Sequence, residues 1–427
     1  MKYTPIDPAL FTKNRNRLAD LLEINSLSFV TSADLMPRNG DLFHAYRQNS
    51  DLFYLTGIEQ ENSTLIIRKE NNTVEAFLFI TEPDQKMIIW EGPKLTIDEA
   101  KAISGINNVY YNTDFQKITE ELSYNINTFY IAKNENPRFA SNIQTGEIQL
   151  ENKLKENFNK IIFKSLYPFI SQCRLLKDER EIELIKKACD ITKNAFLRVL
   201  KTTKPGMKEY EVEAEISYEF LKAGASGHAY APIIASGKNS CYLHYVKNNA
   251  TLKSGDILFL DFGAEYANYA SDCSRAIPIN GKFTQRQKEV YEAVMKVFYE
   301  ARKLIVPGTT IAQYHKIVCK HIEEMCLKLN LFSLADLKNQ DNKNPLFYKY
   351  YMHGTSHFIG LDTHDCGSKE TILEPGMIVS CEPGIYIAEE GLGIRLENDI
   401  LITQNGNIDL LEEIPLSIEE IEYLMHK

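Results

Sequence analysis

Apolar and polar residues alternate with helical periodicity in four long stretches of the second half of the chain. These stretches run from Asp178 to about Lys201, from Lys208 to Ala223, from Thr284 to about Ile305 and from Ile311 to Leu329. The first pair is interrupted by Lys204-Pro205-Gly206-Met207, and the second pair is interrupted by Val306-Pro307-Gly308-Thr309, 102 residues later. The pattern therefore predicts two helix pairs that repeat in the same order.

An apolar run ending in an acid follows each helix pair. The phrase GDILFLDFG opens at Gly255 and GMIVSCEPG opens at Gly376, with the acid six residues after the glycine in both. A second acid follows each run, so residues from about 178 to 410 are predicted to form two related halves that each deliver two carboxylates to one centre. The four acids are Asp261 and Asp272 in the first half, and Glu382 and Glu397 in the second.

The stretch from Gly255 to Arg275 predicts two antiparallel strands joined by a short turn. A turn on Tyr266-Ala267 places Asp261 opposite Asp272, and a turn on Ala267-Asn268 places the two acids one diagonal step apart. Both registers leave the acids on one face, with Cβ atoms about 5 Å or about 7–8 Å apart. Carboxylates this close require a cation or a proton between them. The alternative for these two residues alone is a solvated acidic hairpin.

The first half of the chain alternates strands and helices, which predicts an α/β domain over residues 1–170, ahead of a second domain over 171–427. Its Pro37–Gly57 segment is polar and aromatic, and is too irregular for a core element. A Gly/Ser-rich loop is expected after Gly224 in the second domain. The elements expected in the first domain are a helix over Leu10–Leu22, strands over Ser28–Val30, Thr64–Arg68, Val74–Ile80, Met87–Trp90 and Phe129–Ala132, a turn at Glu70-Asn71-Asn72, and a helix capped by Thr96.

Composition narrows the class of protein. The 427 residues are 44% hydrophobic and 25% charged, as in globular proteins, and a net charge of −10 without a basic block argues against nucleic-acid binding. No apolar run reaches the roughly 18–20 residues of a membrane span, and the N-terminus lacks signal-peptide features. Eight cysteines without CxxC spacing predict reduced thiols and a cytoplasmic location. Cys273 and Cys381 adjoin candidate ligands and are interpreted as small buried apolar residues.

Three of the nine histidines lie within twelve residues, in YMHGTSHFIGLDTHDCG. A helix would place His353, His357 and His364 on one face, but Gly354 and Gly360 disfavour a helix, and the zinc motif HExxH is absent. One histidine is expected to be a ligand, with the others as nearby hydrogen-bond donors. Four carboxylates carry −4, which balances two divalent cations, and an oxygen-rich shell favours Mn²⁺, with Co²⁺ or Zn²⁺ as substitutes.

These elements, LDFGAEYANYASDCSR, HGTSHFIGLDTHD, MIVSCEPGIYIA and GIRLEND, together with YRQNSDLFYLTG over Tyr46–Gly57, resemble aminopeptidase P, the Xaa-Pro aminopeptidases of the pita-bread metallopeptidase superfamily. The resemblance implies an α+β protein, with an N-terminal creatinase-like domain for oligomerisation and substrate access, and a pita-bread catalytic domain. It also implies a homodimer or homotetramer that hydrolyses the N-terminal bond of peptides with proline in the second position.

The resemblance also assigns roles to residues. Two metal ions would share a bridging hydroxide that attacks the peptide bond, with Glu382 as proton shuttle. Asp261 would chelate one ion, His357 and Glu382 the other, while Asp272 and Glu397 would bridge both. His353 and His364 would hydrogen-bond the substrate carbonyl and the tetrahedral intermediate, and His244 would line the proline pocket. Arg395 would orient carboxylates near the metal ions, with Tyr386 close by. Asp41 would lie near the substrate's free amine.

Two further residues stay open. Trp90 either enters a neighbouring subunit's site, as a family tryptophan does, or packs in the core, and His228 has no assigned role. The loop between Pro383 and Gly393 is shorter than in some family members, which leaves pocket depth and oligomer geometry undecided. The alternative functions are a prolidase restricted to dipeptides, a non-catalytic binding module, and metal-free creatinase-like chemistry. The complete ligand set disfavours the last two.

Overall fold

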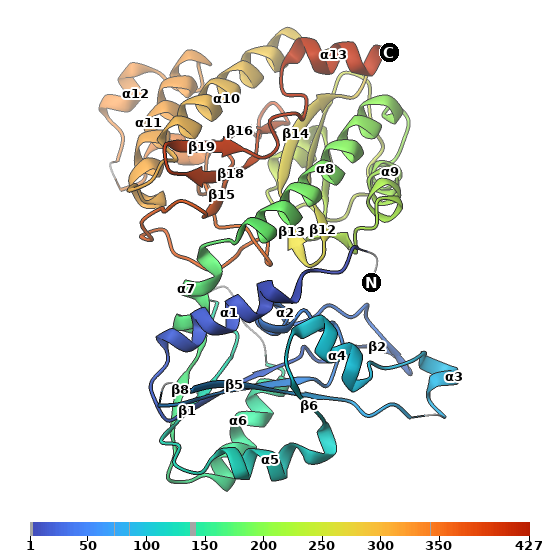
Figure 1. Cartoon of the computed structure of the whole chain (residues 1–427). Helices are drawn as coiled ribbons and strands as arrows, with labels where there is room; N and C mark the ends of the chain where they lie inside the picture. Colours follow the sequence, from blue (N-terminus) through green and yellow to red (C-terminus); the bar gives the residue numbers. More distant parts are fainter. Residues whose placement is uncertain (1–2, 72, 85, 137–141, 342) are drawn as a thin grey trace. The chain divides into compact units, whose positions relative to one another are not determined.

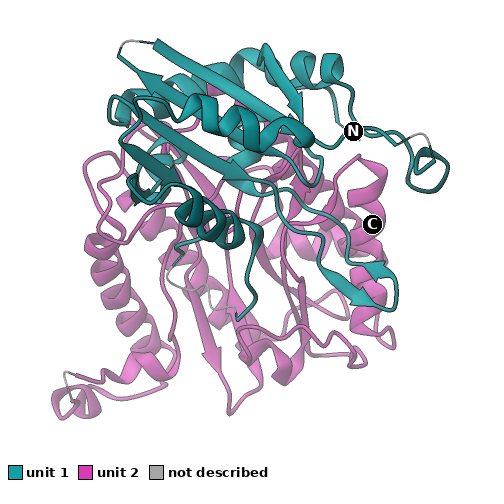
Figure 2. Ribbon diagram, turned by 90° about the horizontal axis from the view of Figure 1, so that it is seen from below, with its two compact units in different colours: residues 1, 3–174 teal, residues 2, 175–427 magenta. Residues whose placement is uncertain are grey.

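The computed structural model describes residues 3–71, 73–84, 86–136, 142–341 and 343–427. These residues form two compact units, 3–174 and 175–427 (Figure 2).

Unit 1 is built on a six-stranded mixed sheet with strand order β6-β5-β4-β1-β7-β8 (Figure 1). β1 runs antiparallel to β4 and parallel to β7, and β6 and β8 add in parallel at the two edges. The strands are β1 (Ser26–Thr31), β4 (Thr64–Glu70), β5 (Thr73–Ile80), β6 (Asn108–Tyr111), β7 (Thr128–Ile131) and β8 (Ile162–Ser165), beside a separate hairpin of β2 (Pro37–Asn39) and β3 (Leu42–Phe43). The α/β class expected for this half is confirmed, and Asn72 of the expected turn lies outside the described residues.

Helices cover both faces of this sheet. In Figure 1, α1, α2 and α4 lie on one face, and α5 and α6 lie on the other. The helices are α1 (Pro8–Leu21), α2 (Ser50–Thr56), α3 (Ile88–Glu91), α4 (Ile97–Ser104), α5 (Phe115–Leu122), α6 (Gly146–Asn157) and α7 (Tyr167–Leu175). On the second face, Phe29, Phe79 and Phe129 of the sheet form a buried cluster with Leu122 of α5 and Leu154 of α6.

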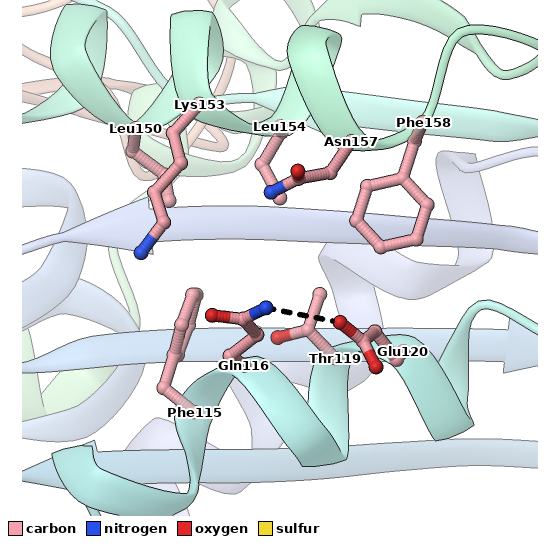
Figure 3. A pocket seen from close by; sticks show the side chains of 9 residues that line it. All are labelled: Phe115, Gln116, Thr119, Glu120, Leu150, Lys153, Leu154, Asn157 and Phe158. Atoms are coloured by element: carbon pink, nitrogen blue, oxygen red, sulfur yellow. Dashed lines mark hydrogen bonds between the residues drawn. The ribbon is translucent and has the colours of Figure 1, made fainter.

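A small cavity lies between α5 and α6 (Figure 3). Its volume is about 20 Å³, room for roughly one water molecule. Along the α5 wall of the cavity, Gln116 Nε2 donates to Glu120 Oε1 at 3.1 Å. Leu150, Leu154 and Phe158 line the opposite wall. This cavity is a packing gap between two helices.

One expected irregular segment is a core helix. α2 buries Leu52, Phe53 and Leu55 completely, so the expectation that Pro37–Gly57 holds no core element is wrong. Asn49 caps the helix by accepting from two backbone N–H groups, and Gly57 ends it in the left-handed conformation at φ 67°. Because the helix is buried on all sides, its sequence carries no amphipathic pattern.

The expected strand at Met87–Trp90 is also wrong, because this segment forms the one-turn helix α3. The Asp84 carbonyl accepts from the N–H groups of Met87 and Ile88, which closes a turn and leaves no strand. The β-favouring residues Ile89 and Trp90 are both 84% exposed within the chain, so Trp90 is no core residue.

Unit 2 repeats one arrangement twice, which confirms the expected duplication. α8 (Glu179–Thr202) and α9 (Glu209–Lys222) precede a sheet in the order β10-β11-β14, and α10 (Gln285–Leu304) and α11 (Ile311–Lys328) precede a sheet in the order β15-β18-β19. Figure 1 shows the two helix pairs on opposite sides of the strands. The remaining elements are β9 (Gly227–His228), β10 (Ile233–Ser236), β11 (Ile257–Phe262), β12 (Ala264–Tyr266), β13 (Tyr269–Ala270), β14 (Cys273–Pro278), β15 (Ile378–Cys381), β16 (Gly384–Ile387), β17 (Leu392–Arg395), β18 (Asn398–Thr403), β19 (Gly406–Asp409), α12 (Leu334–Lys338) and α13 (Ile418–His426). The loop expected after Gly224 contains β9 and β10, strands too short to give a clear pattern.

The acidic hairpin adopts the second of the two expected registers. Asp261 pairs with Ser274, which places Asp272 one diagonal step away. The turn residues Ala267 and Asn268 have φ angles of 51° and 64°, as a tight type I′ turn requires. Gly263 lies between β11 and β12, where the two backbones approach so closely that an added Cβ would lie 1.7 Å from the Ser271 carbonyl oxygen. The solvated-hairpin alternative is wrong, because Asp261 and Asp272 are 7% and 4% exposed.

His228, which the sequence left without a role, packs inside unit 2. Its ring lies against Phe220 with 4.9 Å between ring centroids, and its Nε2 lies 2.8 Å from the Ser217 hydroxyl. Burial lowers the pKa of His228 to about 4. The residue is therefore a neutral packing element at physiological pH.

This packing predicts a pH-dependent stability difference. The unfolded chain protonates His228 near its ordinary pKa of about 6.5, whereas the folded chain resists protonation until about pH 4. The melting temperature of the wild type should therefore fall relative to that of His228→Gln as pH falls from 7 toward 4. Melting curves of both proteins at several pH values test this, and a constant difference would contradict it.

Candidate metal centre

The acids expected to share a centre lie where strands of the two halves end. Asp261 lies within β11 and Asp272 directly precedes β14, while Glu382 directly follows β15 and Glu397 directly precedes β18. An isolated bridge between Ser274 and Glu397 joins the two halves at this point. The duplicated fold therefore brings residues more than 100 positions apart together.

His357 approaches three of the carboxylates. Its Nε2 lies 3.4 Å from Asp272 Oδ2 and 3.9 Å from Glu397 Oε1. The distance from the same nitrogen to Glu382 Oε1 is 3.7 Å. Ligand atoms of Asp272, His357 and Glu397 all lie within 4.8 Å of one another, which is close enough to hold a metal ion. The segment carrying His357 is irregular, as the glycines predicted.

Asp261 completes the cluster through two polar neighbours. The Tyr230 hydroxyl lies 2.6 Å from Asp261 Oδ1 and 2.5 Å from Asp272 Oδ1. The Arg395 guanidinium donates to Asp261 Oδ2 and also donates to the Ser274 hydroxyl, which in turn donates to Glu397 Oε2 at 2.6 Å. These contacts hold oxygen atoms of three buried carboxylates in one place.

The carboxyl groups resist ionisation where they lie. Burial raises the pKa of Asp261, Glu382 and Glu397 above the ordinary carboxyl range. For Glu397 the neighbouring negative charge of Asp272 raises it further, whereas Arg395 opposes the rise at Asp261. Such a cluster favours the binding of cations.

The two histidines of this centre have opposite protonation tendencies. Burial acts to lower the pKa of His357, but its hydrogen bond to Asp272 and the charges of Glu382 and Asp272 outweigh burial and raise the pKa to about 9. Burial, together with the positive charge of Arg395, lowers the pKa of His353 to about 3. His353 is therefore neutral under ordinary conditions.

His353 takes part in a chain of hydrogen bonds. Its Nδ1 lies 2.8 Å from the Gly354 carbonyl, which only accepts, so Nδ1 carries the proton. Nε2 then accepts from the Tyr386 hydroxyl at 2.9 Å, and that hydroxyl accepts from Arg395 at 3.0 Å. Arg395 and Tyr386 thereby fix the tautomer and orientation of His353.

Three other predicted residues are exposed. The His364 ring lies against that of His357 with 4.4 Å between ring centroids. His244 follows a short 3-10 helix, and its charge contributes to the lowered pKa of His353. Asp41 lies exposed in the turn between β2 and β3 of unit 1.

Comparisons with known proteins identify the family. Residues 183–404 match metallopeptidase family M24, and residues 11–130 match the aminopeptidase P N-terminal domain. The Xaa-Pro aminopeptidase of Haemophilus influenzae is 33% identical over 97% of both chains. The chain belongs to the Xaa-Pro aminopeptidases of family M24. The enzyme is accordingly a hydrolase, a metallo-exopeptidase.

Solved structures of the family confirm the two-domain architecture of this Xaa-Pro aminopeptidase. A putative aminopeptidase P from Bacillus anthracis has a TM-score of 0.92 at 34% identity, and 99% of each chain is covered. Zinc-substituted aminopeptidase P from E. coli in complex with product has a TM-score of 0.89 at 32% identity, with the same coverage.

The residues of the centre fit divalent metal ions. The metal-binding group Asp272, His357 and Glu397 offers carboxylate and imidazole donors, and two further carboxylates, Asp261 and Glu382, lie in the same cluster. Cys273 and Cys381 are fully buried, as expected. Oxygen-rich sets of this kind suit hard divalent ions. Among the described helices, none combines the length and apolar character needed to cross a membrane.

The structure adds residues that the sequence analysis missed. Arg275, fully buried, donates to the Glu397 carbonyl at 2.8 Å and to the Asn398 side chain. Asp399, also fully buried, accepts from the Asp272 backbone N–H at 3.0 Å. Both residues lie two or three positions from a candidate ligand in sequence, which was the available signal. Tyr230 stands far from every ligand along the chain and gave none.

The contacts of Tyr230 lead to a prediction about metal affinity. Tyr230→Phe removes the hydroxyl that orients Asp261 and Asp272, and loss of such an outer-shell partner costs about 10–100-fold in metal affinity. Isothermal titration calorimetry with Mn²⁺ measures the metal affinity of each protein. Tyr218→Phe, at a half-exposed tyrosine on α9, is the matched control, and equal affinities of the two variants would contradict the expectation.

Proposed function

We propose that this enzyme hydrolyses the N-terminal Xaa-Pro bond with two divalent metal ions held by Asp261, Asp272, His357, Glu382 and Glu397. The observation that supports this most directly is the convergence of all five side chains from both halves of unit 2, with His357 Nε2 within 3.9 Å of three carboxylates. Mn²⁺ is the preferred ion, with Co²⁺ or Zn²⁺ as substitutes. The zinc-substituted E. coli relative is consistent with that range.

The contacts are consistent with the proposed division of ligands between two ions. Asp272 and Glu397 lie on either side of the seam between the halves, which suits bridging positions. His357 and Glu382 would complete one ion, and Asp261 the other. Bound there, the two ions would activate water as the nucleophile and stabilise negative charge on the substrate.

Glu382 is the proposed proton shuttle between water and the proline nitrogen. Its side chain is 16% exposed, compared with 10% for Asp261, 6% for Asp272 and 3% for Glu397. The shuttle must reach both water and the leaving group, so the most accessible of the four carboxylates suits the role. The Ser380 hydroxyl donates to Glu382 at 3.3 Å and orients it.

Substrate recognition is proposed to rest on three histidines, with Asp41 holding the free amine. His353 and His364 would donate to the substrate carbonyl and the tetrahedral intermediate, and His244 would line the proline pocket. His353 requires a partner exchange to do so, because both ring nitrogens already have partners within the chain. Arg395 would orient carboxylates and Tyr386 would orient His353.

Unit 1 is proposed to mediate oligomerisation and substrate access in a homodimer or homotetramer. The exposed Trp90 suits the proposed role in a neighbouring subunit's site. A cytoplasmic location is proposed because all eight cysteines are free.

Peptide kinetics test the proposed specificity. A Xaa-Pro-Xaa peptide should be cleaved and its Xaa-Ala-Xaa analogue should not, because proline makes the scissile bond a tertiary amide recognised by ring shape. A chelator should abolish turnover and Mn²⁺ should restore it. Equal cleavage of both peptides would contradict Xaa-Pro specificity, and cleavage of Xaa-Pro dipeptides alone would indicate a prolidase.

Glu382→Gln tests the proton shuttle. The amide oxygen still coordinates a metal ion, but it cannot carry a proton, so turnover should fall by about 10²–10⁴-fold. Steady-state kinetics are measured beside metal content, with Glu389→Gln as the control at an exposed glutamate. Near-normal turnover of the metal-loaded Glu382→Gln enzyme would remove this residue from proton transfer.

A further inference from the structure

Glu209 is a fully buried carboxylate that accepts five hydrogen bonds. Its Oε1 accepts from the Ser236 N–H and hydroxyl, both at 2.7 Å, and from Asn239 Nδ2 at 3.2 Å. Its Oε2 accepts from the Tyr245 hydroxyl and the Ala250 N–H, both at 2.8 Å. Among the described residues, no lysine, arginine or histidine makes an ion pair with it. All five of its partners are hydrogen-bond donors, which suits a carboxylate.

All five donors belong to one segment of the chain, residues 236–250, which we call the His244 loop. Ser236 lies at its start, Asn239 and Tyr245 lie within it, and Ala250 lies at its end. A single carboxylate therefore ties the beginning, middle and end of the loop to the first turn of α9. Tyr245 is the neighbour of His244 in sequence, so the restraint acts next to the histidine.

The His244 loop also packs against β17. The Gly393 N–H donates to the Ser240 hydroxyl at 2.8 Å, and a Cβ added at Gly393 would lie 2.1 Å from the Ser240 carbonyl oxygen. β17 ends at Arg395, which belongs to the metal centre. The loop is thus held between α9 and the strand that carries Arg395.

We propose that Glu209 is a positioning residue that sets substrate recognition by holding His244 in place. The residue is shielded from solvent, so it acts through the loop rather than on the substrate. The proposal rests on the proposed function, because it takes His244 as a substrate-binding residue. Weakening the Glu209 contacts releases the loop and raises KM for peptides that extend beyond proline, while the chemical step remains intact.

Glu209→Gln is the first test, because the variant keeps the size of the side chain. One carboxylate oxygen becomes an NH₂ group, which cannot accept from the donors that face it. KM for a Xaa-Pro-Xaa peptide is expected to rise about tenfold with kcat and Mn²⁺ affinity unchanged. Glu215→Gln, at a glutamate of the same helix that pairs with Arg198, is the control expected to change neither constant.

A double-mutant cycle shows whether Glu209 acts through His244. If it does, Glu209→Gln combined with His244→Ala raises KM no further than His244→Ala alone. Additive increases in KM would overturn the proposal. An effect on kcat or on Mn²⁺ affinity as large as that on KM would also overturn it, since it would indicate a general structural role.

Hydrogen exchange provides a readout that does not depend on activity. Backbone amides of residues 237–249 should exchange faster in Glu209→Gln than in the wild type, and unchanged exchange overturns the proposal. If the loop loosens while His244→Ala leaves KM unaltered, the assignment of His244 fails, and Glu209 has no role in recognition. Failure of the wild type to prefer Xaa-Pro-Xaa is distinguishable, because it disproves the proposed function itself.

Tyr245→Phe keeps the test decisive if Glu209→Gln does not fold. The change removes one of the five donors and leaves the ring, which packs against a small apolar cluster around Phe259. KM is expected to rise about two- to threefold, with faster exchange near residue 245. Wild-type values of both quantities would overturn the proposal.

Discussion

Mutual repulsion among four buried carboxylates is the constraint on which the catalytic unit depends. Asp261, Asp272, Glu382 and Glu397 share one centre, and none is more than 16% exposed in its side chain. Like charges at these distances cannot all ionise without compensation. Arg395 supplies one positive charge and His357 binds a proton readily, which leaves the cluster short of positive charge. Divalent cations bound at this centre would relieve the remaining repulsion, in keeping with the metallopeptidase family to which the chain belongs.

The duplication explains how such an unfavourable cluster is held together. Each half supplies two acids in or directly beside strands whose apolar residues are buried, so hydrophobic burial in the sheets stabilises the frame. The seam between the halves is closed by buried polar contacts: Ser274 with Glu397, and Arg275 with the Glu397 carbonyl. Because each contact joins one half to the other, neither half holds its carboxylates in place alone.

The sequence predicted those features of the fold and the site that a local residue pattern encodes. The helix pairs have strong apolar periodicity, and the acids lie at equal distances after Gly255 and Gly376, so the helices, the duplication and the shared centre were accessible. The segments predicted wrongly lacked that information: α2 is buried all round, and α3 exposes apolar residues on a tip. The hairpin register stayed open between two choices until the φ angles of Ala267 and Asn268 decided it. The roles of individual site residues remain predictions.

The residues that no local pattern reveals are those that connect elements. Tyr230 contacts two acids 31 and 42 positions away, and Glu209 holds a loop up to 41 positions away. Their types are ordinary and only the fold gives them partners, so a single sequence cannot distinguish them from other tyrosines and glutamates. Both are buried polar groups, and a buried polar group is retained at a free-energy cost unless its hydrogen bonds are made. The complete satisfaction of Glu209 by five donors is therefore the physical sign that this side chain organises the structure around it.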